Sequence, residues 1–219
     1  MKKIQSDSRT TSSPTRILLT GFRPYDGMTI NPTEQLMRRA PAILTGISGI
    51  TLRALVLETD YRRSEQQFLA ALDDFRPDVA LSFGLSRRID EIKLERVGIN
   101  VDDSPIPDNS GRLRRGQKIA EAGPVGYWAT IPIEAILQAL QDAGIPAGVS
   151  NHAGAYICNH LLYFGLHVIA ARGLPTRMGF VHTPPLPEMV QDGSGRSGMR
   201  MEMLVEAVRI IVAAIAGRL

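Results

Sequence analysis

Three residues far apart in the sequence carry the side chains that a cysteine hydrolase needs. Cys158 is the only cysteine, His182 lies where an apolar segment meets a proline-rich stretch, and Glu95 opens a short apolar segment. Such an enzyme requires a thiolate nucleophile, an imidazole that takes and returns a proton, and a group that orients the imidazole. Because folding brings these groups together, their order along the sequence is free. We interpret them as a candidate nucleophile, general base and orienting carboxylate.

The position of Cys158 is compatible with the role of a nucleophile. The turn at Ala153-Gly154 precedes a long apolar helix pattern, so Cys158 falls in or near the first helical turn. Unpaired N–H groups and the positive end of the helix dipole favour a thiolate there. The alternative is structural, because a free cysteine usually behaves as a small buried hydrophobic residue. The sequence around Cys158 does not decide between the two.

The other histidines differ in their ability to reach Cys158. His160 and His167 follow it by two and nine residues. At about 100° per residue, both therefore point to the opposite side of the helix. His152 lies on the turn before the cysteine and stays a competitor of His182 for the role of the base. His182 itself has a structural alternative, since a lone histidine at a strand end often has no catalytic role.

Glu95 also has two interpretations. It lies at the start of a strand predicted over 95–101, and an acid beside buried apolar residues requires a partner. It could instead lie at an exposed sheet edge and pair with Lys93 or Arg96, as surface ion pairs do. Both interpretations stay open.

The segments that must position these residues alternate between strand and helix patterns. This alternation predicts an α/β fold with a mostly parallel twisted central sheet and helices on both faces. In such a sheet, ligands bind at loops that follow the carboxyl ends of strands, here 21–27 and 84–91. The predicted strands are 16–20, 50–57, 79–83, 95–101 and 179–183, and the predicted helices begin at Asn31-Pro32 and cover 60–75, 133–144, a segment after Gly154, and 200–217.

Composition favours a soluble, cytoplasmic protein with one domain. We expect this domain over 16–219, behind a disordered polar tail at 1–15. The net charge of +3 is too small to predict nucleic-acid binding, and no apolar run is long enough to span a membrane. A single cysteine cannot form an intrachain disulfide, which fits a reducing compartment. The irregular loop at 102–129 is unusually long, and such loops are often functional or mobile.

Four stretches resemble the pyroglutamyl (pyrrolidone-carboxylate) peptidases, and the resemblance covers about residues 16–215. It implies a cytoplasmic three-layer α/β cysteine peptidase without cofactor or metal, which often assembles as a homotetramer. The implied activity is removal of an amino-terminal pyroglutamate from peptides. The stretches are Thr20-Gly21-Phe22-x-Pro24-Tyr25 with Asn31-Pro32; Glu95-Arg96-Val97-Gly98-Ile99-Asn100 with Ile106-Pro107-Asp108-Asn109; Val149-Ser150-Asn151-x-Ala153-Gly154-x-Tyr156-Ile157-Cys158-Asn159; and Gly179-Phe180-Val181-His182-x-Pro184-x-Leu186-Pro187.

The resemblance also implies roles for individual residues. By motif, Cys158 is the nucleophile, His182 the general base and Glu95 its partner. Phe22 and Tyr25 match the aromatic pair that holds the lactam ring. The other implied substrate-binding positions are Leu85, Tyr156 and Ile157.

Several residues around the implied substrate pocket depart from the family pattern. Leu85 replaces a glutamine that would hydrogen-bond the lactam amide, and Tyr25 replaces a phenylalanine. Three hypotheses therefore stay open: a pyroglutamyl-peptidase-like hydrolase, a related cysteine hydrolase of another amino-terminal cap or small amide, and a non-catalytic ligand-binding relative. The remaining departures are Asp26, Arg87, Lys93, Gly98, Pro105 and His152.

Overall fold

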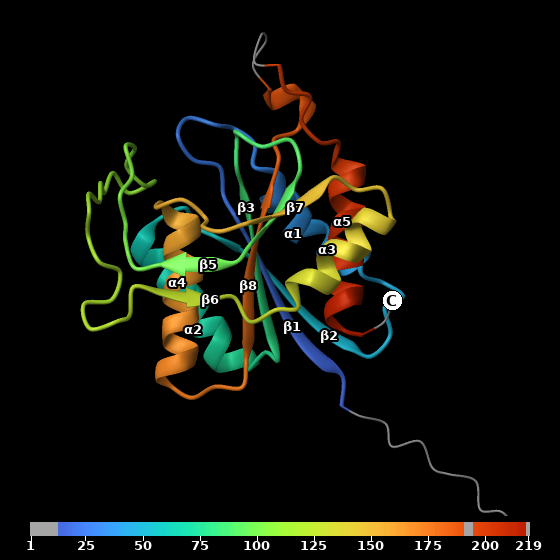
Figure 1. Ribbon diagram of the computed structural model, residues 1–219, viewed down its shortest axis with the longest axis horizontal. Helices are drawn as coiled ribbons and strands as arrows, with labels where there is room; N and C mark the ends of the chain where they lie inside the picture. The colour runs from blue at the N-terminus through green and yellow to red at the C-terminus, as the bar shows by residue number, and fades with distance from the viewer. Residues whose placement is uncertain (1–12, 191–194, 218–219) are drawn as a thin grey trace, which may run out of the picture.

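A six-stranded sheet lies at the centre of this computed structural model, which describes residues 13–190 and 195–217 (Figure 1). The strand order is β2-β1-β3-β8-β4-β7. Every neighbouring pair is parallel except β4 and β8, which are antiparallel. The predicted mostly parallel sheet is confirmed. Its strands are β1 (Thr15–Phe22), β2 (Ile50–Leu57), β3 (Val79–Leu85), β4 (Ile92–Glu95), β7 (Ala147–Ser150) and β8 (Arg177–Thr183).

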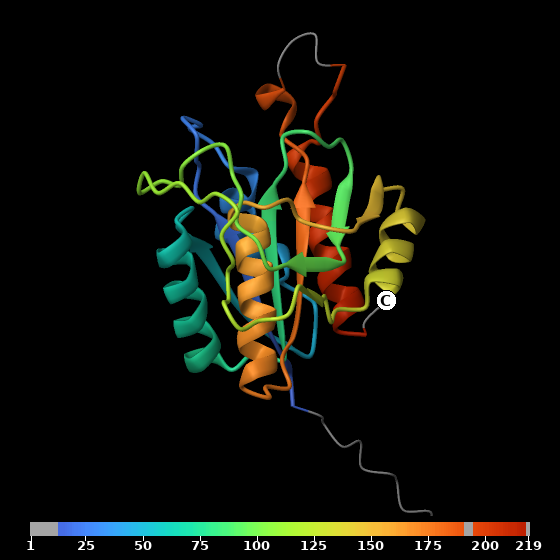
Figure 2. The same ribbon diagram turned by 60° about the vertical axis from the view of Figure 1, so that its left-hand side comes forward.

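Helices cover both faces of this sheet, as predicted. α1, α3 and α5 pack together on one face, and α2 and α4 pack together on the other; Figure 2 shows the layers after a turn of the view. Each face has its own buried cluster of apolar side chains, with Leu81 and Ile211 in one and Leu161 and Phe180 in the other. The helices are α1 (Pro32–Ile43), α2 (Tyr61–Phe75), α3 (Ile133–Asp142), α4 (Ile157–Ala171) and α5 (Met201–Ile215).

Local sequence signals explain where the early helices begin. Asn31 caps α1, because its side chain accepts a hydrogen bond from the backbone N–H of Thr33, and proline takes the first helical position. Asp60 caps α2 in the same way through the N–H of Arg63, at 2.8 Å. These caps fix the points at which α1 and α2 begin.

The prediction of one strand over 95–101 is wrong. β4 ends at Glu95, and the chain then leaves the main sheet to form β5 (Val97–Ile99), which pairs antiparallel with β6 (Gly126–Trp128). The pair crosses α4 closely: a Cβ atom added to Gly98 would lie 2.9 Å from the backbone nitrogen of Tyr163. Glu95 is therefore the last residue of a strand rather than the first.

Two further expectations concern the ends and surface of the chain. Residues 1–12 of the predicted tail at 1–15 lie outside the described residues. The predicted boundary at residue 15 is too late, because Thr15 already pairs with Ile50 in the sheet. Among the described residues, no helix combines the length and the apolar character that crossing a membrane requires.

Candidate active site

Two neighbouring strands bring His182 and Glu95 onto the same face of the sheet. His182 of β8 pairs in register with Gly84 of β3 on one side and with Lys93 of β4 on the other. Side chains alternate along a strand, so Glu95, two residues beyond Lys93, shares the face of His182. The antiparallel pairing of β4 and β8 is what makes these two residues diagonal neighbours.

The imidazole and the carboxylate form a buried pair. His182 Nδ1 lies 2.7 Å from Glu95 Oε1, and the two residues are 7% and 2% exposed. The alternative partners of Glu95 bond elsewhere, Lys93 to Glu91 and Arg96 to Asn151. The structure thus supports the buried interpretation of Glu95, in which the carboxylate leaves Nε2 as the free nitrogen of the ring.

Cys158 is the second residue of α4 and is partly exposed. Its side chain acts on the imidazole of His182 and raises the pKa of that ring. Burial lowers the pKa of His182, but the charge of Cys158 and the bond to Glu95 together raise that pKa to about 10. The positively charged imidazolium is therefore favoured next to the sulfur.

The first turn of α4 also faces this site with unsatisfied backbone groups. Tyr156 is the N-cap residue, and no side chain of the cap accepts a hydrogen bond from the helix. The first N–H groups of a helix have no acceptor within the helix. Behind this turn, Asn159 is fully buried and its side chain donates to the carbonyls of Ile99 and Val101 at 2.9 Å each, which fixes the helix start against β5.

Sequence reasoning missed Gly84, which forms the floor below the thiol. A Cβ atom added there would lie 2.8 Å from Cys158 Sγ and 2.7 Å from Phe180 Cζ. The Phe180 ring in turn contacts His182, with 5.0 Å between ring centroids. The sequence did carry a signal for it, because a glycine inside an apolar strand often marks a point where another part of the chain or a ligand comes close to the backbone.

The aromatic residues predicted to bind substrate lie around the same centre. Phe22, at the end of β1, is buried, and its ring lies 6.3 Å from that of Phe180. Tyr25 lies 5.8 Å from Tyr156, measured between ring centroids. Burial, followed by the charge of Cys158, raises the pKa of Tyr25 to about 12. The Tyr25 hydroxyl is therefore neutral at ordinary pH.

The two apolar residues predicted to bind substrate are both nearly inaccessible. Ile157 is 1% exposed and belongs to the buried cluster under α4. Leu85 is 4% exposed, and the alternation of β3 places its side chain on the face opposite to that of Gly84. Contact of either residue with a substrate stays a prediction.

The structure separates the four histidines. His152 is exposed, and its Nδ1 accepts a hydrogen bond from the N–H of Gly154 at 3.2 Å. His160 is fully buried, with ring nitrogens 2.9 Å from carboxylate oxygens of Asp102 and of Glu65. Of the four, it is His182 that the structure pairs with the cysteine.

The first half of the 102–129 loop forms one wall beside these aromatic residues. The side chain of Asn109 donates to the carbonyl of Pro24 at 2.9 Å, and the Tyr156 hydroxyl donates to the carbonyl of Pro107 at 3.0 Å. The loop is thus fastened to both segments that supply Tyr25 and Tyr156.

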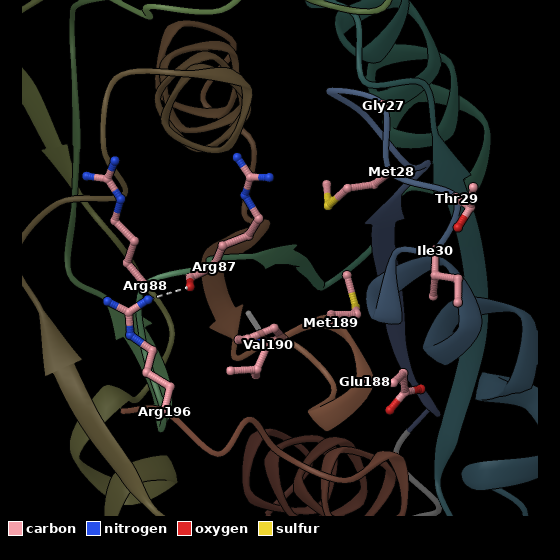
Figure 3. A pocket seen from close by; sticks show the side chains of 11 residues that line it. Gly27, Met28, Thr29, Ile30, Arg87, Arg88, Glu188, Met189, Val190 and Arg196 are labelled. Atoms are coloured by element: carbon pink, nitrogen blue, oxygen red, sulfur yellow. Dashed lines mark hydrogen bonds between the residues drawn. The ribbon is translucent and has the colours of Figure 1, made fainter. Parts of the chain in front are cut away.

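A cavity of about 480 Å³ lies among the segments that follow β1, β3 and β8. Figure 3 shows Arg87 and Arg88 running side by side along one of its walls, with Met28 and Met189 nearer its middle. Its lining does not include Cys158. The cavity therefore borders the loops predicted to hold a ligand without containing the thiol.

Comparisons with known proteins identify the family and the fold. The family model described as pyroglutamyl peptidase matches residues 15–218. The pyrrolidone-carboxylate peptidase of Brevibacillus brevis is 37% identical over 196 residues, which is 90% of each chain. That of Pyrococcus furiosus is 35% identical over 90% of this chain and 96% of its own. The structure also resembles the crystal structure of pyroglutamyl peptidase I from Bacillus amyloliquefaciens, with a TM-score of 0.87, 30% identity and coverage of 93% and 97%. The chain therefore belongs to the pyroglutamyl peptidase family of cysteine-type exopeptidases.

Proposed function

We propose that this protein removes an amino-terminal pyroglutamyl residue from peptides, with Cys158 as nucleophile, His182 as general base and acid, and Glu95 as the residue that orients His182. The observation that carries the proposal is the buried Glu95 and His182 pair at 2.7 Å, with Cys158 at the start of a helix and close enough to raise the pKa of His182. The names of the relatives support pyroglutamate as the acyl group.

Acylation begins from a Cys158 thiolate beside the His182 imidazolium. The sulfur attacks the carbonyl carbon of the pyroglutamyl residue, and the carbonyl oxygen takes the negative charge. Backbone N–H groups in the uncapped first turn of α4 stabilise this oxyanion. His182 then gives its proton to the amide nitrogen as the C–N bond breaks, which releases the shortened peptide and leaves a thioester.

Deacylation reverses these roles. Neutral His182 takes a proton from a water molecule as the water oxygen attacks the thioester carbon. The C–S bond breaks, pyroglutamic acid leaves, and the thiolate and imidazolium pair is restored. Glu95 keeps the ring in the orientation in which Nε2 faces sulfur, and it stabilises the imidazolium because the pair is shielded from water.

The aromatic residues supply the binding site for the uncharged lactam ring. Flat neutral rings suit apolar slots with few polar groups. Phe22 lies against Phe180 below the thiol, and Tyr25 with Tyr156 lies on the side of the 102–129 loop. We propose that Phe22 and Tyr25 bind the ring, with Tyr156, Leu85 and Ile157 shaping the pocket.

The test is release of a fluorescent amine from a pyroglutamyl substrate by the wild-type protein and by Cys158→Ala. We expect hydrolysis by the wild type and loss of at least about a thousandfold in kcat without the nucleophile. Trapping of a thioester on Cys158 by rapid acid quench and mass spectrometry identifies the intermediate. Activity that persists unchanged in Cys158→Ala would reject the assignment.

The alternative is hydrolysis of a substrate with a different acyl group. Leu85 favours it, because an apolar side chain cannot hydrogen-bond a lactam amide. A panel of lactam, acyl-amino-acid and small amide substrates compares the two. A preference for pyroglutamate by more than about a hundredfold in kcat/KM excludes this alternative, and a preference for another cap establishes it.

We also propose a cytoplasmic homo-oligomer, a tetramer by family resemblance, built from a single domain over 16–219. Val125 and Trp128 at the β5–β6 pair are 87% and 67% exposed and offer an apolar surface for such contacts. Light scattering after size-exclusion chromatography measures the assembly, and replacement of Trp128 by a charged residue should weaken it.

A further inference from the structure

Two loops that border the candidate site are joined by one ion pair. Asp26 follows Tyr25 in the loop after β1, and Arg87 lies in the loop after β3. Arg87 Nη2 lies 2.9 Å from Asp26 Oδ2, across 61 residues of sequence. The contact therefore joins two segments that are distant in the sequence.

The backbone at Asp26 adopts a conformation that is unusual for a residue with a side chain. Asp26 has a φ of +54°, in the left-handed region where glycine meets least strain. The next residue, Gly27, also has a positive φ, of +72°. Aspartate is one of the few other residues that tolerate this conformation. A carboxylate therefore occupies a turn position whose backbone favours glycine, and it faces Arg87.

Arg87 is fixed on its other side as well. The side chain of Arg196, in the segment after β8, donates to the backbone carbonyl of Arg87 at 3.2 Å (Figure 3). Arg87 thus contacts segments that follow β1 and β8, which end near Phe22 and His182 respectively. It links three of the chain segments that surround the site.

The ion pair lies close to Tyr25. Burial and the charge of Cys158 raise the pKa of the Tyr25 hydroxyl most; of the ion pair, Arg87 lowers this pKa and Asp26 raises it, each by a smaller amount. The Tyr25 carbonyl accepts the N–H of Met28 at 3.1 Å, which closes the turn that holds Asp26. Movement of Asp26 would therefore move the turn and the Tyr25 ring with it.

We propose that the Asp26 and Arg87 ion pair is a positioning device that fixes the Tyr25 loop over the site and thereby lowers KM for the substrate. The effect on KM rests on the proposed function. The connection that the ion pair makes between the two loops, here called the tie, does not. Neither residue touches the reacting atoms in this proposal. Both act through Tyr25.

Charge-removing variants that keep the backbone geometry test the tie. Asp26→Asn retains a residue that tolerates positive φ, and Arg87→Met retains much of the side-chain volume. Arg88→Met is the matched control, because Arg88 is an exposed arginine in the same cavity wall without an ion-pair partner in residues 13–190 and 195–217. The double variant Asp26→Asn/Arg87→Met completes a double-mutant cycle, which measures the coupling between the two side chains.

The first measurement is amide hydrogen exchange in residues 22–31, which needs no substrate. Exposed ion pairs have modest effects, so we expect exchange about two- to fivefold faster in each single variant, with no further increase in the double variant. About 1 M NaCl should produce a similar increase in the wild type, because the screening length is then about 3 Å. Unchanged exchange in both single variants, or an equal change in Arg88→Met, overturns the tie.

The second measurement is the division between KM and kcat on a pyroglutamyl substrate. We expect KM to rise about two- to fivefold in each single variant with kcat nearly constant, and Arg88→Met to match the wild type. Changed exchange without a change in KM rejects the substrate-positioning role. A wild type with no hydrolysis rejects the proposed function instead, and the exchange data still decide whether the tie exists.

Discussion

Replacement of Gly84 by alanine should damage catalysis far more than stability. The added methyl carbon would lie 2.8 Å from Cys158 Sγ and 2.7 Å from Phe180 Cζ, whereas non-bonded heavy atoms pack at about 3.5–4.0 Å. The thiol and the ring must therefore retreat by about 0.7 Å or more. His182 depends on both, because Cys158 raises the pKa of its imidazole and the Phe180 ring lies 5.0 Å from it, measured between centroids.

The size of the effect follows from this displacement. A misplacement of about 1 Å in a catalytic group can cost about a hundredfold in rate, so we expect kcat to fall by about 30- to 100-fold. Overpacking of one methyl group costs about 1–3 kcal/mol. Since globular proteins are stable by about 5–15 kcal/mol, Gly84→Ala should remain folded.

Gly165→Ala is the control for overpacking away from the site. Gly165 lies in α4, and an added Cβ would collide with the Met178 side chain and lie 3.0 Å from Phe68 Cε1. We expect a similar loss of stability but kcat within about threefold of the wild type. The assays are fluorogenic hydrolysis, urea denaturation, and the rate at which iodoacetamide alkylates Cys158. The reasoning is refuted if folded Gly84→Ala keeps kcat within about threefold of the wild type.

Three further predictions concern the ionisable groups. Glu95→Gln should lower kcat by about 10²–10⁴-fold and lower the pKa of His182, seen as a shift in the pH–rate profile, because the carboxylate no longer stabilises the imidazolium. The pKa of His182 is raised from 6.5 to about 10, so the stabilisation of the fold by its imidazolium is complete below pH 6.5 and is lost as pH rises through about 10. Cys158→Ala should move this loss to lower pH. Urea denaturation across this pH range and NMR titration of the imidazole measure the effect. His160→Ala should destabilise the protein by about 1–3 kcal/mol, because it removes the buried hydrogen bond between the imidazole and Asp102, whereas Asp102 keeps its ion pair with Arg114; equal urea midpoints for wild type and variant would contradict this.

The sequence was sufficient for most of the layers of the fold and for the local position of Cys158. Period-two and helical patterns located β1, β2, β3, α2 and α5 close to their observed bounds, because these elements bury regular apolar faces. The position of Cys158 in the first turn of α4 followed from the glycine turn before it. The helical rotation also placed His160 and His167 away from the thiol, and the structure gives them other partners.

Local signals could not show which elements become neighbours. The chain reverses direction between β3 and β4, because β3 runs parallel and β4 antiparallel to β8, and it leaves the main sheet after Glu95 to form β5 over α4. Neither event has a local pattern. The choice of His182 over His152, and of a buried partner for Glu95, depended on this strand order.

The sequence by itself determined that a lone cysteine begins a buried helix, that two other candidate residues lie by apolar strands, and that the chain resembles one peptidase family. Only the tertiary structure decided that Glu95 pairs with His182 beside Cys158, that Gly84 leaves space for the sulfur, and that Asp26 pairs with Arg87. The physical reason is that helix and strand periodicity reflect contacts within a few residues. These three arrangements instead depend on which strands pair in the sheet and in which register.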